Sequence, residues 1–156
     1  MDSYKITEGH KYIPIMFMDD SACISDKPPG RPVVKVAMHF DDNHHVNPKG
    51  TENLTVYALL DTGAEHNYAT PEFIAVSACP QLGTSLIHGA TSSAPGTHHR
   101  CHLFFPEALV QLETDVFSAA LRNSTATENL IVGMAAISMG RLVMDFKQHI
   151  YRLYWA

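Results

Sequence analysis

At 156 residues, with 46% hydrophobic and 17% charged side chains, the chain has the size and composition of one globular domain, which excludes disordered and membrane-spanning proteins. The net charge of -5 argues against a nucleic-acid partner, because phosphate contacts require clustered Lys and Arg. No apolar run approaches the length of a membrane span, and residues 1–20 show no secretory signal. We therefore expect no membrane partner and a cytoplasmic location.

The three cysteines, Cys23, Cys79 and Cys101, are odd in number and far apart in the sequence. This spacing favours a reducing compartment and roles as small hydrophobic residues over a disulfide framework. Nothing near Cys79 or Cys101 in the sequence marks an activated thiol.

Residues 1–32 are predicted to form an N-terminal arm that precedes a domain at residues 33–156. The apolar run 12–18 contains Pro14, which excludes it from a central strand. The Pro- and Gly-rich segment 28–32 then punctuates the chain. Two roles stay open for the arm: packing on the surface of its own domain, or contact with a second subunit or a substrate.

The alternation in residues 33–40 predicts a strand with apolar residues on one face and polar residues, including His39, on the other. Residues 41–52 are polar and contain Asn47-Pro48-Lys49-Gly50, which is typical of a hairpin loop. Residues 53–60 return as a second strand, which delivers an acidic turn.

That turn is Asp61-Thr62-Gly63, followed by Ala64. A carboxylate at the end of an apolar strand costs stability unless it has partners or serves chemistry. The string from Leu60 to Tyr68 resembles the active-site turn of the retropepsin-like aspartic proteases, the retroviral and retroelement type. The alternative is a turn aspartate that nearby backbone amides satisfy.

The resemblance implies catalysis by Asp61, a hydrogen bond from Thr62 across a subunit interface, and a turn shaped by the Gly63 backbone. Enzymes of this class hold two carboxylates about 3 Å apart, which share one proton and bind a water. The chain has one Asp-Thr-Gly and no internal repeat. A twofold homodimer would supply the second aspartate.

After the turn, Thr70 and Pro71 predict the cap and first residue of a short helix at 71–78. Residues 83–88 and 97–105 are candidate strands on either side of a small, polar segment. They predict a hairpin that covers the substrate as a flap, and an ordinary surface hairpin is the alternative. The candidate substrate-binding residues at its tip are Gly89, Ala90, Thr91 and Ser92.

Residues 108–121 offer further strands, with Val110, Leu112, Val116 and Phe117 as candidate core residues. Residues 130–134 (Leu-Ile-Val-Gly-Met) resemble the second signature of the family, which opens a short helix behind the active site. Ala135 stands where the family often has an acid or amide, so a capping or hydrogen-bonding role at this position is in question. The resemblance covers residues 33–156.

Residues 143–146 and 150–155 are predicted to close the chain as a hairpin. The last strand carries apolar and aromatic residues on both faces, which is costly to leave in water. The resemblance implies that the termini of two subunits interleave in one sheet at the dimer interface. In the alternative, Trp155 packs on its own barrel as part of a closing strand.

The densest histidine cluster is His98-His99-Arg100-Cys101-His102. In a strand, alternation sends these side chains to opposite faces, and no Cys or His pair has zinc-finger spacing. We therefore expect no metal site and interpret the cluster as polar residues on the outer face of a flap arm.

Together these features predict an all-β fold, a small closed barrel with one short C-terminal helix. The predicted function is an aspartic endopeptidase that hydrolyses an extended peptide or protein substrate at a homodimer interface without a cofactor. The alternative is a non-catalytic member of the same fold that serves as a dimerisation or peptide-binding module.

Overall fold

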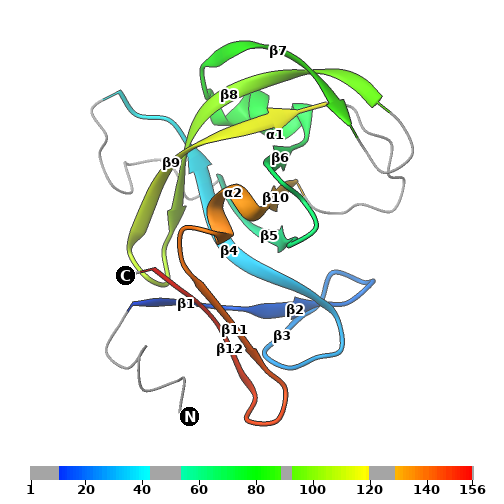
Figure 1. The fold of residues 1–156 in the computed structure, drawn as a ribbon, viewed down its shortest axis with the longest axis vertical. Coiled ribbons are helices and arrows are strands. Elements are labelled where there is room, and N and C mark those ends of the chain that lie inside the picture. Colours follow the sequence, from blue (N-terminus) through cyan, green and yellow to red (C-terminus); the bar gives the residue numbers. More distant parts are fainter. Residues whose placement is uncertain (1–10, 43–53, 89–92, 120–128, 156) are drawn as a thin grey trace.

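The computed structural model describes residues 11–42, 54–88, 93–119 and 129–155. Strands dominate this part of the chain, and two short helices interrupt them (Figure 1). The strands are β1 (Tyr12–Pro14), β2 (Met16–Met18), β3 (Ile24–Ser25), β4 (Arg31–His39), β5 (Thr55–Leu60), β6 (Asn67–Ala69), β7 (Gln81–His88), β8 (Ser93–Phe105), β9 (Val110–Ser118), β10 (Leu130–Val132), β11 (Arg141–Asp145) and β12 (Ile150–Tyr154). The helices are α1 (Pro71–Ser77) and α2 (Met134–Ile137).

A nine-stranded sheet with the order β3-β2-β4-β5-β10-β6-β9-β8-β7 forms the body of the molecule. Strand β4 also pairs with β8, with Met38 opposite Leu103. This pairing closes six strands into a barrel, in the order β4, β5, β10, β6, β9 and β8. Closure leaves no unpaired edge on these strands. The β7–β8 hairpin lies at the top of the view in Figure 1, and a separate sheet of β1, β12 and β11 lies at the bottom.

The short barrel strands β6 and β10 alternate between buried and half-exposed residues, whereas the end of β4 is buried on both faces. His39 was expected on a polar outer face, but only 3% of it is exposed. The prediction is wrong because β4 leaves β5 at this end and pairs with β8, where His102 covers His39 with ring centroids 5.6 Å apart. Long-range strand pairing therefore buries a polar residue that local alternation places outside.

Strands β1 and β2 join the N-terminal residues to both sheets. Strand β2 pairs with β4, and β1 pairs with β12, with Ile13 opposite Leu153. Pro14 lies in β1 at the edge of its sheet, as its missing N–H requires. The C-terminal and N-terminal segments of the same chain thus form one sheet.

Strand β12 is the central strand of this three-stranded sheet, between β1 and β11. Leu153 is fully buried, and Trp155 is 7% exposed with its ring 4.7 Å from that of Phe105 on β8. The alternative in which Trp155 packs on its own barrel is confirmed. Strands of the same chain occupy both edges of β12, so it pairs directly only within its own subunit; a shared sheet between two subunits would need β1 or β11 and stays a prediction.

The described residues contain both helices that the sequence indicated, one after the Asp61 turn and one in the second signature. Helix α1 begins where Thr70 and Pro71 indicated: the Thr70 hydroxyl accepts the Phe73 N–H at 3.3 Å. Helix α2 follows Gly133 in the second signature. No helix in the described part of the chain is long and apolar enough to cross a membrane.

Candidate active site

Asp61 follows directly after β5, one of the barrel strands. Its backbone N–H donates to the Val132 carbonyl oxygen at 3.0 Å, continuing the parallel pairing of Leu60 with Val132. Leu60 is buried and Asp61 is half-buried, as alternation along the strand requires. The barrel therefore holds the backbone of Asp61 while its side chain reaches the surface of the subunit.

The three residues of the turn have distinct positions. One Asp61 carboxylate oxygen, Oδ1, accepts the Gly63 N–H at 2.9 Å, and the Asp61 carbonyl accepts the Ala64 N–H at 3.3 Å. Thr62 and Gly63 are exposed at the apex. The structure thus places the predicted catalytic residues together, with the Thr62 side chain accessible to a second molecule.

Two other aspartates in the chain make the same kind of local contact. Asp19 accepts the N–H groups of Ser21 and Cys23, and Asp145 accepts those of Lys147 and Gln148, all at 2.9 Å. Asp19 is exposed in a turn, and Asp145 ends β11 in the separate three-stranded sheet. Asp61 differs because it extends a barrel strand.

The turn after Asp61 is bound to the start of α2 through backbone groups. The Met134 N–H donates to the Ala64 carbonyl at 2.7 Å, and the Ala135 N–H donates to the Glu65 carbonyl at 3.0 Å. A Cβ atom on Gly133 would lie against the His66 carbonyl oxygen, so only glycine allows this approach. The second signature therefore supports the turn by close backbone contact.

Asn67 supplies the buried amide that is missing at Ala135. Its side chain is fully buried; Oδ1 accepts the Gly133 N–H at 3.0 Å, and Nδ2 lies 3.2 Å from both Thr114 Oγ1 and the Asp115 carbonyl. One side chain thus joins the segment after the Asp61 turn, the second signature and β9. The sequence shows an amide within a short β-strand. It does not indicate the hydrogen-bond partners of that amide, because they are distant in the chain.

A row of half-exposed side chains crosses the sheet on the face to which alternation assigns Asp61. The strand registers place its members opposite one another on β5, β10, β6, β9 and β8: Leu59, Ile131, Tyr68, Phe117 and His98. Their flanking neighbours on β5, β10, β6 and β9 are all buried. This half-exposed row is a candidate surface for an extended ligand beside Asp61.

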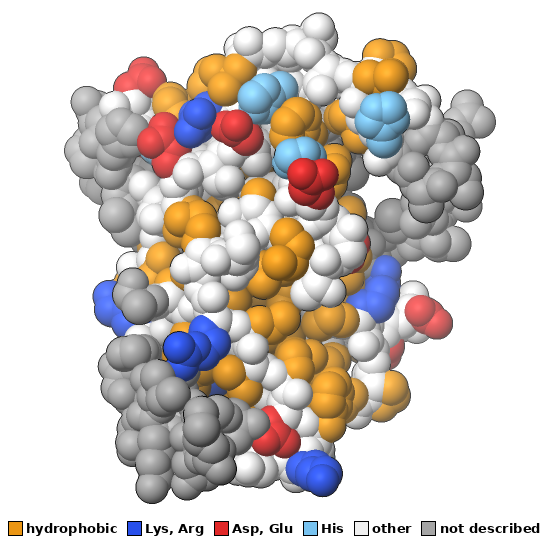
Figure 2. All heavy atoms as spheres, in the orientation of Figure 1, with side chains coloured by type: hydrophobic (Ala, Val, Ile, Leu, Met, Phe, Trp, Pro, Cys, Tyr) orange, Lys and Arg blue, Asp and Glu red, His pale blue; other side chains and the backbone are white. Residues whose placement is uncertain are grey.

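Aromatic and titratable groups gather at the far end of the row. The His98 ring stacks on Phe117 with centroids 4.6 Å apart, and its Nε2 lies 3.0 Å from an Asp115 carboxylate oxygen. Burial, with a smaller effect from Glu65, raises the pKa of Tyr68. Figure 2 shows histidine, hydrophobic and acidic side chains together over the upper part of the molecule, where β8 and β9 lie in Figure 1.

The predicted flap has its two arms in β7 and β8, which pair from Gln81 opposite His99 to His88 opposite Ser93. The four candidate substrate-binding residues at its tip, Gly89, Ala90, Thr91 and Ser92, lie outside the described residues. The hairpin is confirmed, and its role as a flap stays a prediction.

Only part of the histidine cluster on β8 lies on a polar outer face as expected, since His98 and Arg100 are half-exposed. His99 is 5% exposed, with Nδ1 3.1 Å from the Cys79 carbonyl, and His102 is 1% exposed, with Nδ1 accepting the Asp41 N–H at 3.3 Å. The prediction is wrong for these two residues because β4 and the segment after α1 cover them. Among the described residues, no group of three or more His, Cys, Asp or Glu is placed to hold a metal ion.

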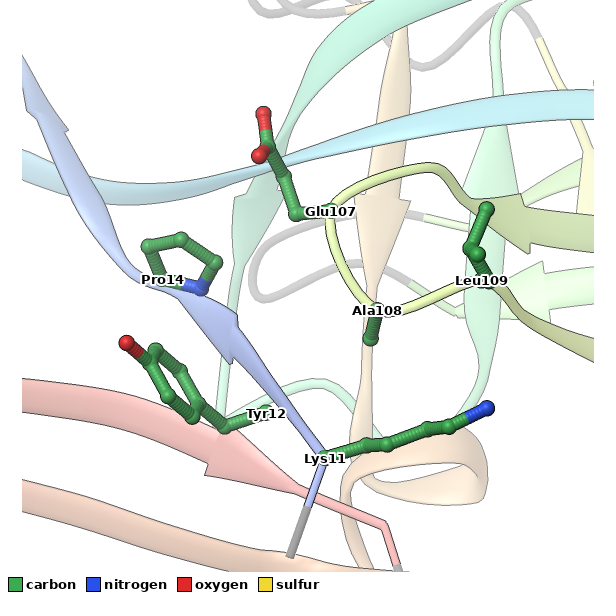
Figure 3. Close-up of a pocket in the computed structure, with 6 residues that line it drawn as sticks. All are labelled: Lys11, Tyr12, Pro14, Glu107, Ala108 and Leu109. Atoms are coloured by element: carbon green, nitrogen blue, oxygen red, sulfur yellow. The ribbon is translucent and has the colours of Figure 1, made fainter.

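Figure 3 shows a surface depression of about 370 Å³ beside β1. It is lined by Lys11, Tyr12, Pro14, Glu107, Ala108 and Leu109. No residue of the Asp-Thr-Gly turn or of the half-exposed row contributes to it. We therefore assign it no part in the chemistry of Asp61.

No protein-family model matches the sequence, and no curated protein matches it. Among solved structures, the chain is similar to the EIAV protease complexed with the inhibitor HBY-793. The TM-score is 0.52 at 15% sequence identity, over 73% of this chain and 93% of that chain. Similarity at this identity concerns the fold. The chain has an all-β, retropepsin-like fold, as the sequence predicted.

Proposed function

We propose that the chain is an aspartic endopeptidase that acts as a homodimer, with one Asp61 from each subunit in a shared catalytic site. The observation that carries this proposal is the position of Asp61 at the end of a closed barrel strand, half-buried and followed by an exposed Thr62. One subunit has one such aspartate, and a twofold axis beside the turn would bring two of them together.

The proposed mechanism divides two roles between the paired carboxyl groups. One Asp61 is ionised and removes a proton from a water molecule as the water attacks the peptide carbonyl. The other Asp61 is protonated, donates a hydrogen bond to the developing oxyanion and passes a proton to the leaving amine. Because two adjacent carboxylates cannot both ionise easily, the pair titrates as a unit. No cofactor is needed.

The half-exposed row supports an extended peptide as the substrate. Its side chains, among them Leu59, Ile131 and Tyr68, lie in line across successive strands on the face assigned to Asp61. Apolar and aromatic surface of this kind favours bulky side chains of a bound peptide. The β7–β8 hairpin would cover that peptide. The EIAV protease of similar fold was solved with an inhibitor bound, which is consistent with a ligand-binding role for this architecture.

An activity assay on denatured casein at about pH 5, with and without a statine-type inhibitor, tests the proposal. Asp61→Asn keeps the size of the side chain and its contact with Gly63 but removes the ionisable group, so activity should fall by several orders of magnitude. Asp145→Asn is the matched control, because Asp145 also accepts turn amides and lies outside the proposed site. Equal activity of the wild type and Asp61→Asn would reject the proposal.

If neither the wild type nor the control variant cleaves casein, a binding assay addresses the alternative function. A non-catalytic peptide-binding or dimerisation module would still dimerise and would bind the inhibitor or a peptide without hydrolysis. In that case Asp61→Asn would change the affinity for the inhibitor or the peptide, and neither protein would cleave the peptide.

A further inference from the structure

The segment after α1 runs beside β8 and brings two buried cysteines together. Gln81 lies opposite His99 in the antiparallel pairing of β7 with β8, and the Arg100 N–H donates to the Pro80 carbonyl at 3.1 Å. Continuing this register by one pair places Cys79 opposite Cys101. Because the Pro80–Arg100 pair is the hydrogen-bonded one, the two cysteines form the next, non-hydrogen-bonded pair, in which side chains approach most closely.

The two thiols are neighbours in the hydrophobic core. Both are free thiols that belong to the same buried cluster, and each shifts the pKa of the other. Opposite residues in a non-hydrogen-bonded pair have Cα atoms about 4.5 Å apart, and a disulfide requires roughly 4.4–6.8 Å. A Cys79–Cys101 pair that continues this register would therefore have the Cα spacing that a disulfide needs.

The surroundings make the two thiols unequal. The neighbouring Cys101 lowers the pKa of Cys79 against the opposing effect of burial, and the Ser77 hydroxyl, 3.2 Å from the Cys79 sulfur, lowers it further. The neighbouring Cys79 and burial both raise the pKa of Cys101. Cys79 is also 7% exposed, whereas Cys101 is fully buried. Because the Cys79 side chain is the more accessible of the two, we assign it as the attacking sulfur and Cys101 as the resolving one.

We propose that Cys79 and Cys101 form a redox site, a dithiol that closes to a disulfide by exchange with a low-molecular-weight disulfide such as oxidised glutathione. The Cys79 thiolate, having lost its proton to solvent, attacks one glutathione sulfur; the reagent's S–S bond breaks, and the departing thiolate takes up a proton. Cys101 then loses its proton and attacks the Cys79 sulfur, which releases the second glutathione thiol. Two electrons pass from the protein dithiol to the reagent, which becomes two thiols.

The new bond would tie the end of α1 to the barrel part of β8. The loop that it closes contains all of β7 and the β7–β8 hairpin. Closing this loop restricts the unfolded chain, so oxidation should raise the thermal unfolding midpoint. The inference is independent of the proposed proteolytic function, since none of its groups belongs to the Asp61 turn.

The test uses the full chain equilibrated with oxidised glutathione in excess, followed by alkylation and peptide mass spectrometry without reduction. Exposed Cys23 is the internal control, because it reports that the reagent is active. We expect one linked peptide pair joining Cys79 and Cys101, with a mixed glutathione disulfide on Cys23. In Cys23→Ser, oxidation should raise the unfolding midpoint, and dithiothreitol should reverse the rise.

Single variants test the order of the steps. Cys101→Ala should accumulate a mixed disulfide on Cys79, whereas Cys79→Ala should leave Cys101 a free thiol, provided circular dichroism shows that both variants are folded. If either variant is unfolded, the peptides linked in the oxidised wild-type protein decide the proposal. Free or separately glutathionylated Cys79 and Cys101 in a sample whose Cys23 is fully modified would overturn it.

Discussion

The side-chain oxygen of Asn67 accepts the backbone N–H of Gly133 at 3.0 Å, although the two residues are 66 positions apart. This contact fixes the turn after Asp61 against the strand–helix junction of the second signature. The Asn67 amide nitrogen reaches Thr114 and Asp115 on β9 from the same position. One fully buried amide therefore reinforces the backbone hydrogen bonds that hold the candidate catalytic turn against α2.

Replacing Asn67 by Ala should destabilise the fold strongly. The change removes the partner of the Gly133 N–H and leaves that group buried without a hydrogen bond, which costs about 2–3 kcal/mol of unfolding free energy. Thr114→Val is the matched control, because it removes only one of the two acceptors of the Asn67 amide. Urea denaturation of both variants measures the difference. Equal losses in the two variants would contradict the central role of Asn67.

Acidification should weaken the fold through His39. Burial, and secondly the adjacent His102, lowers the pKa of His39 from its usual 6.5, against smaller opposing effects of Asp41 and Gln111. The unfolded chain therefore binds a proton below about pH 6.5 that folded His39 does not accept, so stability is lost as the pH falls through this window. Thermal unfolding between pH 8 and 5 measures the loss.

His39→Gln should reduce this pH dependence, because glutamine is polar but does not titrate. The matched control His88→Gln, at an exposed histidine, should leave the pH dependence of stability unchanged. If His39→Gln and the wild type lose the same stability between pH 7 and 5, His39 is not the group responsible. The pH dependence of proteolytic activity below pH 7 should therefore be measured only at pH values where circular dichroism shows a folded chain.

The C-terminal strand should matter for folding of the subunit. Leu153 is fully buried in β12, between two strands of its own chain, so Leu153→Ala should lower the unfolding free energy by about 2–5 kcal/mol. Phe146→Ala, at a side chain that is 58% exposed, is the control and should change it little. Light scattering on the folded fraction should show the same subunit association in both variants. A weakened dimer without loss of stability would contradict this role for β12.

The sequence predicted the elements whose signals are local. Alternation and turn residues identified β5 and the β7–β8 arms, and Thr70 with Pro71 identified the start of α1. The Asp61 turn was found because its three residues are contiguous. These features depend on interactions between near neighbours, which a single sequence records.

The features that the sequence did not reveal depend on pairing between distant segments. His39 and His102 are buried because β4 and β8 close the barrel, and local alternation gave them an exposed face. The partners of Asn67 lie on β9 and before α2, and β12 is sealed by β1 from the other end of the chain. No local pattern indicates such contacts.

The shared catalytic site is tested most directly by mixing wild type with Asp61→Asn at equal concentrations and allowing subunits to exchange. If each site needs Asp61 from both subunits, only wild-type dimers cleave, so the activity per total protein should fall to about one quarter of that of the pure wild type, because random pairing of two equal populations yields that fraction. Asp145→Asn in place of Asp61→Asn should leave the activity unchanged. A fall to about one half would mean that each subunit carries a complete site, and it would contradict the dimeric aspartate pair.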